Sequence, residues 1–220
     1  MSEPTLFPEG EFLRLKIKLA YDGTNFSGWA KQPDRRTVQE EFEKAFATII
    51  RHQCESIVAG RTDAGVHATA QIIHVDVPEG TDLADLAYRL NRLLDTDLRV
   101  LEIELAPEGF HARFSALRRH YQYQIVDANK AINPLERYDR ASWYRPLDLE
   151  RLNEASALLL GEHDFAAFCK FREGATTIRT LETFKWERKA DGLLVAQVVA
   201  DAFCYSMVRN LVGSAVCVAE

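Results

Sequence analysis

The sequence predicts a mixed α+β fold in which strands and amphipathic helices alternate along two successive halves of the chain. Of its 220 residues, 47% are apolar and 27% are charged, which is ordinary for a globular protein and excludes a disordered or fibrous one. Residues 13–19 alternate between apolar and basic side chains, the pattern of a half-buried strand. Thr37 and Glu40 then form a capping box that opens a helix with one apolar face.

The rest of the first half follows the same alternation. A short strand is expected at 56–59 and a longer one at 71–77, with a loop between them. Asp82 is expected to cap a second helix, and residues 98–105 close the half as a strand. This β-α-β-β-α-β order is the split-βαβ, or ferredoxin-like, arrangement, in which the sheet is mostly antiparallel.

The second half repeats this order without obvious sequence identity. Its predicted elements are a strand at Tyr121–Ile125, a helix at 148–160 that Gly161 ends, strands at 177–187 and 193–200, and a helix from about 205. The last strand of a second ferredoxin-like half is missing, so this half is predicted to be truncated. The predicted domains are a flexible tail over 1–12, an N-terminal domain over 13–108 and an incomplete C-terminal domain over 109–220.

The charge of the chain is unevenly distributed. The net charge of −6 and the pI near 5.6 argue mildly against a nucleic-acid partner. Residues 79–108, however, hold eight acids and three arginines, so this stretch alone carries −5. Basic clusters lie at 31–36 and 113–119. Because local potential matters more than net charge, a polyanionic partner stays open.

Cysteine usage and the apolar stretches predict a soluble, cytoplasmic protein. The four cysteines form neither a CxxC pair nor a regular framework, so we expect reduced, mostly buried thiols. The N-terminal residues contain no apolar core of a secretory signal. The longest apolar stretch, Leu211–Ala219, is about half of the roughly 20 residues that span a bilayer.

A glycine-bracketed loop at 60–67, with the sequence GRTDAGVH, is the first candidate site. Aspartate and glycine are common turn formers, so a plain turn is one interpretation. The functional alternative requires Asp63 on a rigid hairpin with its carboxylate facing a cleft, and Arg61 near an anionic ligand. The loop is not a phosphate-binding P-loop, because GxxxxGK[ST] is absent.

Two further segments are candidates. Residues 110–123 interleave aromatic rings with arginines, which suits RNA because rings stack on unpaired bases while guanidiniums hold phosphates. The alternative is a strand whose tyrosines pack in the core. Arg209 lies on an otherwise apolar helix, so we expect largely apolar surroundings, and the guanidinium needs a carboxylate partner unless it snorkels to water.

Other constellations are absent from the sequence. The six histidines show neither HExxH nor a paired Cys/His spacing, so no metal site is expected. There is no GxSxG elbow and no catalytic-cysteine signature.

Taken together, these segments resemble the TruA family of tRNA pseudouridine synthases. The matching segments, in order, are YDGTNFSGW at 21–29, TVQE at 37–40, GRTDAGVHA at 60–68, FHARFSA at 110–116, RHYQY at 119–123, DF at 164–165 and MVRNLVG at 207–213. The resemblance implies an enzyme that converts uridine to pseudouridine in the anticodon stem-loop of tRNA, at about positions 38–40. It also implies two ferredoxin-like halves around a central RNA-binding cleft, a homodimer, and no metal or nucleotide cofactor.

The resemblance also implies roles for single residues. Asp63 matches the catalytic aspartate, and Arg209 the arginine that pairs with it. Tyr121 matches the tyrosine that lies against the target uracil, and Arg61 the arginine that helps to displace the base. Arg119, in the same segment as Tyr121, is expected to contact the substrate.

The reaction type suits an aspartate, because a carboxylate is a natural partner for an electron-poor C1′, as in retaining glycosidases. The sequence leaves open whether Asp63 attacks C1′, attacks C6 or removes the 2′ proton. Two other functions stay open on the residues alone. A non-catalytic RNA-binding protein of paired ferredoxin-like domains would explain the aromatic rings and arginines, and an unrelated Asp-dependent hydrolase would need a second acid or base, for which the loop offers only His67.

Overall fold

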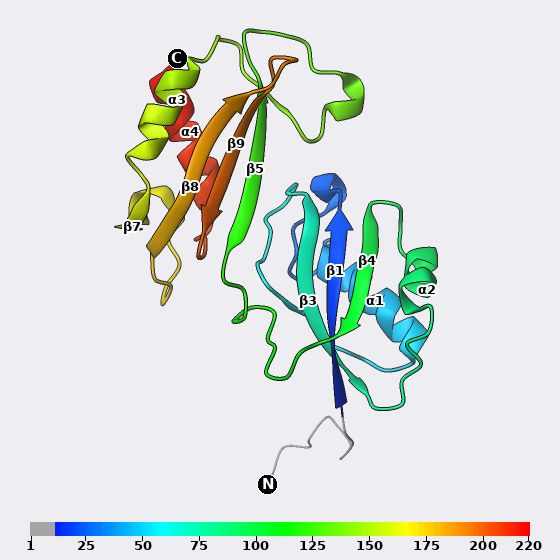
Figure 1. The fold of residues 1–220 in the computed structure, drawn as a ribbon. Coiled ribbons are helices and arrows are strands. Elements are labelled where there is room, and N and C mark those ends of the chain that lie inside the picture. The colour runs from blue at the N-terminus through cyan, green and yellow to red at the C-terminus, as the bar shows by residue number, and fades with distance from the viewer. Residues whose placement is uncertain (1–11) are drawn as a thin grey trace. The chain divides into compact units, whose positions relative to one another are not determined.

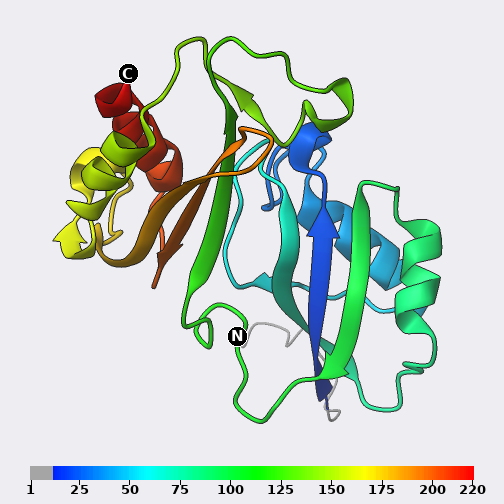
Figure 2. The ribbon, with the colours of Figure 1, turned by 45° about the horizontal axis from the view of Figure 1, so that its top comes forward.

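The computed structural model describes residues 12–220, so the tail expected at 1–12 lies almost wholly outside the described residues. The chain divides into two compact units, the first ending at Ala116 and the second covering Leu117–Glu220. Figures 1 and 2 show a sheet with helices in each unit. No helix among the described residues has the length and apolar character needed to cross a membrane.

The first unit has the predicted β-α-β-β-α-β order of strands and α-helices. Its elements are β1 (Phe12–Tyr21), η1 (Gly23–Asn25), α1 (Val38–Ile50), β2 (Ile57–Val58), β3 (Ala68–Pro78), α2 (Leu86–Leu93) and β4 (Leu98–Leu105). The strands pair in the order β2-β3-β1-β4, and every pairing is antiparallel. Leu15, Ile17 and Leu19 are fully buried, as the alternation along β1 predicts. Figures 1 and 2 show α1 and α2 on the same face of this sheet.

Helix starts were predicted correctly at α1 but not at α2. The Thr37 hydroxyl accepts a hydrogen bond from the Glu40 N–H, as in the predicted capping box. Asp82 was expected to cap α2, but the helix begins at Leu86. The Asp82 carboxylate accepts from Ala84 N–H within a turn, and Asp85 then has the left-handed φ of 52°, which keeps the first residues out of the helix.

The second unit contains two short strands that the sequence did not predict, β6 and β7. Its elements are β5 (Arg119–Val126), η2 (Pro134–Glu136), β6 (Ala141–Ser142), α3 (Leu149–Ala157), β7 (Gly161–Asp164), η3 (Ala166–Phe168), β8 (Ile178–Arg188), β9 (Leu194–Ala200) and α4 (Met207–Ala219). The sheet order is β6-β5-β9-β8-β7, antiparallel except for the β5–β6 pair. Helix α3 ends at Ala157, and Gly161 begins β7 instead of ending the helix.

The boundary between the units lies later than the predicted 108. Residues 109–116 belong to the first unit because they are hydrogen-bonded to its sheet. The Ala112 N–H donates to His74 Nδ1 on β3 (3.0 Å), and Arg14 on β1 donates to the Phe110 carbonyl (2.8 Å). Burial, with a smaller contribution from the Arg14 charge, lowers the pKa of His74 to about 4, so the ring is a neutral acceptor.

The expectation of four reduced thiols is wrong for one pair. Cys169 and Cys204 form a disulfide, whereas Cys54 is half-buried and Cys217 is exposed. The fold brings the first two cysteines together although 35 positions separate them in sequence, so no local sequence pattern predicts this pairing.

Candidate active site

Asp63 lies in the loop that joins β2 to β3, residues 60–67, which we call the Asp63 loop. Its residues form no helix or strand. The Val66 N–H donates to the Asp63 carbonyl (3.2 Å), and Gly65 has a φ of +78°, so a turn forms as the residue types predict. Asp63 is half-buried, whereas Arg61 is exposed.

A second segment fixes this loop in place. Residues 21–29, which we call the bracing segment, run from the end of β1 to Trp29. The Trp29 N–H donates to the Thr62 carbonyl (3.0 Å), and the Gly65 N–H donates to the Phe26 carbonyl (3.3 Å). These two backbone bonds lie on either side of Asp63. They restrain the loop in the way that hydrogen bonds within a sheet restrain a strand.

Two glycines of the bracing segment permit this close approach. Gly28 has a φ of +95°, and a Cβ there would lie 2.8 Å from the Thr62 carbonyl oxygen. A Cβ on Gly23 would overlap the Val66 carbonyl. Only glycine fits both positions without moving the Asp63 loop.

A buried hydrogen-bond network links the loop to the sheet. The Tyr21 hydroxyl lies 2.8 Å from Thr62 Oγ1, next to Asp63 in sequence. Gln71 Nε2, on β3, donates to the Tyr21 hydroxyl (3.2 Å) and to the Gly60 carbonyl (2.8 Å). Burial raises the pKa of Tyr21 despite these hydrogen bonds, so the phenol stays neutral.

His67 closes the other end of the loop. Its Nδ1 lies 3.1 Å from the Gly23 nitrogen and 3.0 Å from the Asp22 carboxylate, so it accepts from the Gly23 N–H when the ring is neutral and donates to Asp22 when Nδ1 is protonated. Burial raises the pKa of Asp22, but hydrogen bonds from Thr24 and the nearby His67 outweigh it, so the pKa is lowered overall. His67 therefore packs against the bracing segment and fastens the loop.

The second unit presents Tyr121 on β5, where it is half-buried and paired in register with Val198 of β9. Its ring meets Phe203 edge to face, with the ring centroids 5.0 Å apart. Arg119 begins the same strand and donates to the Asp201 carbonyl. Tyr121 and Arg119 thus both contact the turn at 201–206 that leads into α4.

The environment predicted for Arg209 is wrong. Met207, Leu211 and Val212 are buried on one face of α4, but Arg209 lies on the exposed face. A 3.6-residue period places positions 207 and 211 together and position 209 away from them. The apolar letters around Arg209 therefore belong to the opposite side of the helix.

Sequence reasoning missed the residues that support the site. Tyr21, Gln71, Gly28 and Phe203 touch the candidate residues or their loops, but the sequence analysis assigned no role to any of them. The available indication was the bracing segment itself, in which two glycines and three aromatic rings fall within nine residues. Among the described residues, no group of three or more His, Cys, Asp or Glu side chains could hold a metal ion.

The fold and the site define an α+β protein of two units. In the first unit, the bracing segment holds the Asp63 loop in place. In the second unit, Tyr121 lies on β5 and Arg209 lies on α4. Residues 18–115 and 155–220 match the tRNA pseudouridine synthase family. A protein of Frankia casuarinae named tRNA pseudouridine synthase A is 52% identical over 209 residues, covering 94% of this chain and 76% of the relative. Proteins of the same name from Streptomyces griseus and Mycobacterium leprae are 52% and 47% identical, over 96% of this chain and 77% and 78% of theirs.

The chain therefore belongs to the tRNA pseudouridine synthase family. It is an isomerase that acts on uridine in tRNA. This result decides against both the non-catalytic RNA-binding protein and the hydrolase that the residues alone left open.

Proposed function

We propose that this chain converts uridine to pseudouridine in the anticodon stem-loop of tRNA, at about positions 38–40, with Asp63 as the catalytic aspartate. The observation that carries the proposal is the fixed Asp63 loop. Backbone hydrogen bonds on both sides of Asp63 and two close-packed glycines restrain the carboxylate before substrate binds. Such preorganisation is what a positioned catalytic group requires.

The chemistry needs no group beyond the protein's own side chains. The N1–C1′ bond breaks, the uracil turns, and C5 joins C1′; C5 loses a proton and N1 gains one. The product has the composition of the substrate, so neither water nor electrons are consumed. A carboxylate is a suitable partner for the electron-poor C1′. Attack at C1′, attack at C6 and removal of the 2′ proton by Asp63 are all consistent with its placement on a braced loop.

The target base must leave its stack, which costs a few kcal/mol. We assign Tyr121 to the face of the flipped uracil, and Arg61, exposed on the Asp63 loop, to the displacement of the base. We assign Arg119, on the same strand as Tyr121, to the substrate, and we keep Arg209 as the residue that the resemblance matches to the arginine partner of the catalytic aspartate.

The test is single-turnover conversion of tRNA by the Asp63→Asn variant. We expect isomerisation to be abolished while tRNA affinity stays within a few-fold, because the carboxylate contributes to chemistry and not to phosphate binding. Asp34→Asn, at an exposed turn of the same unit, is the matched control and should keep full activity. Substantial turnover by Asp63→Asn would refute the assignment. Replacing uridines 38–40 of the tRNA by cytidine should abolish product, and unchanged product would refute the proposed position.

We further propose that each unit is ferredoxin-like and that the protein acts as a homodimer whose tRNA groove draws on both subunits. The support is the limited basic surface of one chain, in which the acidic residues of 79–108 must face away from phosphate. Light scattering should give twice the mass of the 25.0 kDa chain. A fully active monomer would contradict the shared groove.

A further inference from the structure

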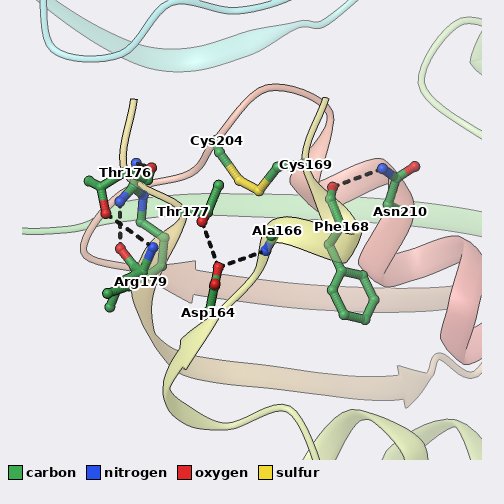
Figure 3. The surroundings of a disulfide bond; sticks show 10 residues. Asp164, Ala166, Phe168, Cys169, Thr176, Thr177, Arg179, Cys204 and Asn210 are labelled. Atoms are coloured by element: carbon green, nitrogen blue, oxygen red, sulfur yellow. Dashed lines mark hydrogen bonds between the residues drawn. A yellow bond between two sulfur atoms is a disulfide. The ribbon is translucent and has the colours of Figure 1, made fainter. Parts of the chain in front are cut away.

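Cys169 and Cys204 are joined at a point where two loops of the second unit meet (Figure 3). Cys169 follows η3, and Cys204 lies in the turn before α4. Their Cα atoms are 5.6 Å apart, within the range that a disulfide requires. Both residues are half-buried, so small reagents reach them.

Hydrogen bonds reinforce the junction on both sides. The Lys170 N–H donates to the Tyr205 carbonyl (2.9 Å), and Asn210 Nδ2, on α4, donates to the Phe168 carbonyl (2.8 Å). The Lys170 ammonium also lies 5.3 Å from the centre of the Tyr205 ring. We call this set of contacts, together with the disulfide, the clasp.

The loop that carries Cys169 is itself ordered. The Asp164 carboxylate accepts hydrogen bonds from the Ala166 N–H (3.0 Å) and the Thr177 hydroxyl (2.5 Å), as Figure 3 shows. These hydrogen bonds restrain the loop that carries Cys169. Because the clasp joins this loop to the turn at 201–206, it restrains the turn as well.

That turn connects the candidate substrate residues of this unit. Phe203, next to Cys204, packs edge to face against Tyr121, and Arg209 follows two residues after the start of α4. Ser206 has a left-handed φ of 67°, a conformation that the surroundings must maintain. Opening the clasp therefore loosens the residues that hold Tyr121 and Arg209.

We propose that Cys169 and Cys204 form a thiol–disulfide modification site, oxidised by peroxides or small disulfides, whose closed form holds the substrate residues of the second unit in place. The thiolate of one cysteine attacks a peroxide oxygen, so an S–O bond forms and the O–O bond breaks; the product is a sulfenic acid, and the leaving oxyanion takes a proton to become water or an alcohol. The second thiol then attacks the sulfenic sulfur, the S–O bond breaks, the oxygen leaves as water and the disulfide closes. Two thiols thus lose two electrons and two protons. A small disulfide reaches the same product through a mixed disulfide, and a dithiol reverses the process.

Of the two other cysteines, Cys54 is a poor competitor for oxidants, whereas Cys217 has to be removed in the experiment. Burial raises the pKa of Cys54 to about 12, so its reactive thiolate is scarce. Cys217 is exposed on α4 but lies outside the clasp. In a compartment that keeps thiols reduced, protein disulfides are usually transient and serve catalysis or redox sensing.

The experiment uses the full chain carrying Cys217→Ser. Samples are reduced with dithiothreitol, or oxidised with hydrogen peroxide in one arm and glutathione disulfide in the other. Alkylation followed by intact-mass measurement should show the loss of two thiols on oxidation. In single-turnover assays, the oxidised form should have roughly three- to tenfold higher kcat/KM on tRNA than the reduced form, because small displacements of positioned groups cost rate.

Cys169→Ser and Cys204→Ser, each combined with Cys217→Ser, should keep the kcat/KM of the reduced enzyme, and neither oxidant should change it. A response in one arm alone identifies which oxidant acts at the site. The proposal is overturned if neither oxidant removes two thiols, if the single-cysteine variants respond equally, or if oxidised and reduced enzyme are equally active. The activity readout rests on the proposed function, but the thiol count does not. If no redox form makes pseudouridine while two thiols still close, the proposed function has failed and the modification site stands.

Discussion

The Tyr21 hydroxyl is the sharpest test of whether the bracing segment controls the Asp63 loop. Tyr21 is 4% exposed, and its ring packs beside Phe26 and Trp29, with centroid separations of 6.4 and 6.2 Å. Tyr21→Phe keeps this packing and removes only the oxygen that reaches Thr62 and Gln71.

The expected magnitude follows from the two hydrogen bonds that are lost. At about 0.5–1.5 kcal/mol each, the free energy of unfolding should fall by about 1–3 kcal/mol. Gln71 Nε2 retains the Gly60 carbonyl, so the buried amide is only partly unsatisfied and the loss should lie in the lower half of that range. The Thr62 carbonyl also keeps its bond from Trp29. The loop is thus loosened on one side only, and we expect the rate to drop about tenfold, less than the roughly 100-fold that a 1 Å misplacement costs.

The assay is single-turnover pseudouridine formation at saturating enzyme, together with urea unfolding of the same preparations. Tyr88→Phe is the matched control, because Tyr88 lies in the same unit but is 63% exposed on α2. A folded Tyr21→Phe protein with a rate within twofold of the unmodified enzyme would refute the idea that this network positions Asp63.

Three further predictions concern strain, charge and metals. Gly28→Ala should lower the rate of isomerisation more than tenfold and destabilise the fold, because the new Cβ would lie 2.8 Å from the Thr62 carbonyl oxygen. Gly80→Ala is the control: Gly80 has a φ of +82° but no neighbour within 4 Å, so its thermal melt measures the cost of backbone strain alone. Asp127→Asn should cost about 1.5–3 kcal/mol in urea titrations, because the Arg188 guanidinium loses its carboxylate partner but keeps its hydrogen bonds to the Gly192 and Leu147 carbonyls. Burial raises the pKa of Asp127, but hydrogen bonds from Arg188 and a backbone N–H outweigh burial, so the pKa is lowered overall. The contribution of Asp127 to the free energy of unfolding is therefore complete above the unfolded pKa of about 3.9 and is lost as the pH falls through the lower, folded pKa. If Asp127→Asn leaves the loss of stability at acidic pH unchanged, this reasoning is wrong. EDTA should leave the rate unchanged on tRNA whose folding is verified separately, and an activity restored by a divalent ion would contradict this.

Much of the fold was predictable because periodicity is a local property. Strand β4 covers residues 98–105 as predicted, and β1 extends the predicted alternation by only a few residues at its ends. Strand β7 was missed because all four of its residues are exposed, so no apolar period marks them. The start of α2 was misplaced because an aspartate that caps a turn and one that caps a helix look alike in sequence.

The candidate site was predictable in its residue types but not in its supports. Glycine and aspartate in the Asp63 loop indicate a turn, and the structure has one. The bracing segment lies about 40 positions away in sequence, and nothing local connects its glycines with that loop. For Arg209, the sequence prediction treated apolar neighbours in sequence as neighbours in space. With 3.6 residues per turn, the helix places those apolar side chains on one face and Arg209 on the other.

A loop without secondary structure holds a catalytic group rigidly only if its backbone groups find partners elsewhere, because unpaired buried N–H and C=O groups are costly. The bracing segment provides these partners for the Asp63 loop: Trp29 donates to the carbonyl just before Asp63, and Phe26 accepts from Gly65 just after it. The entropy of fixing the loop is therefore offset during folding and not when tRNA binds. Substitutions in residues 21–29 should then lower the rate of isomerisation more than they weaken tRNA binding, even though they act through the loop and not through the substrate.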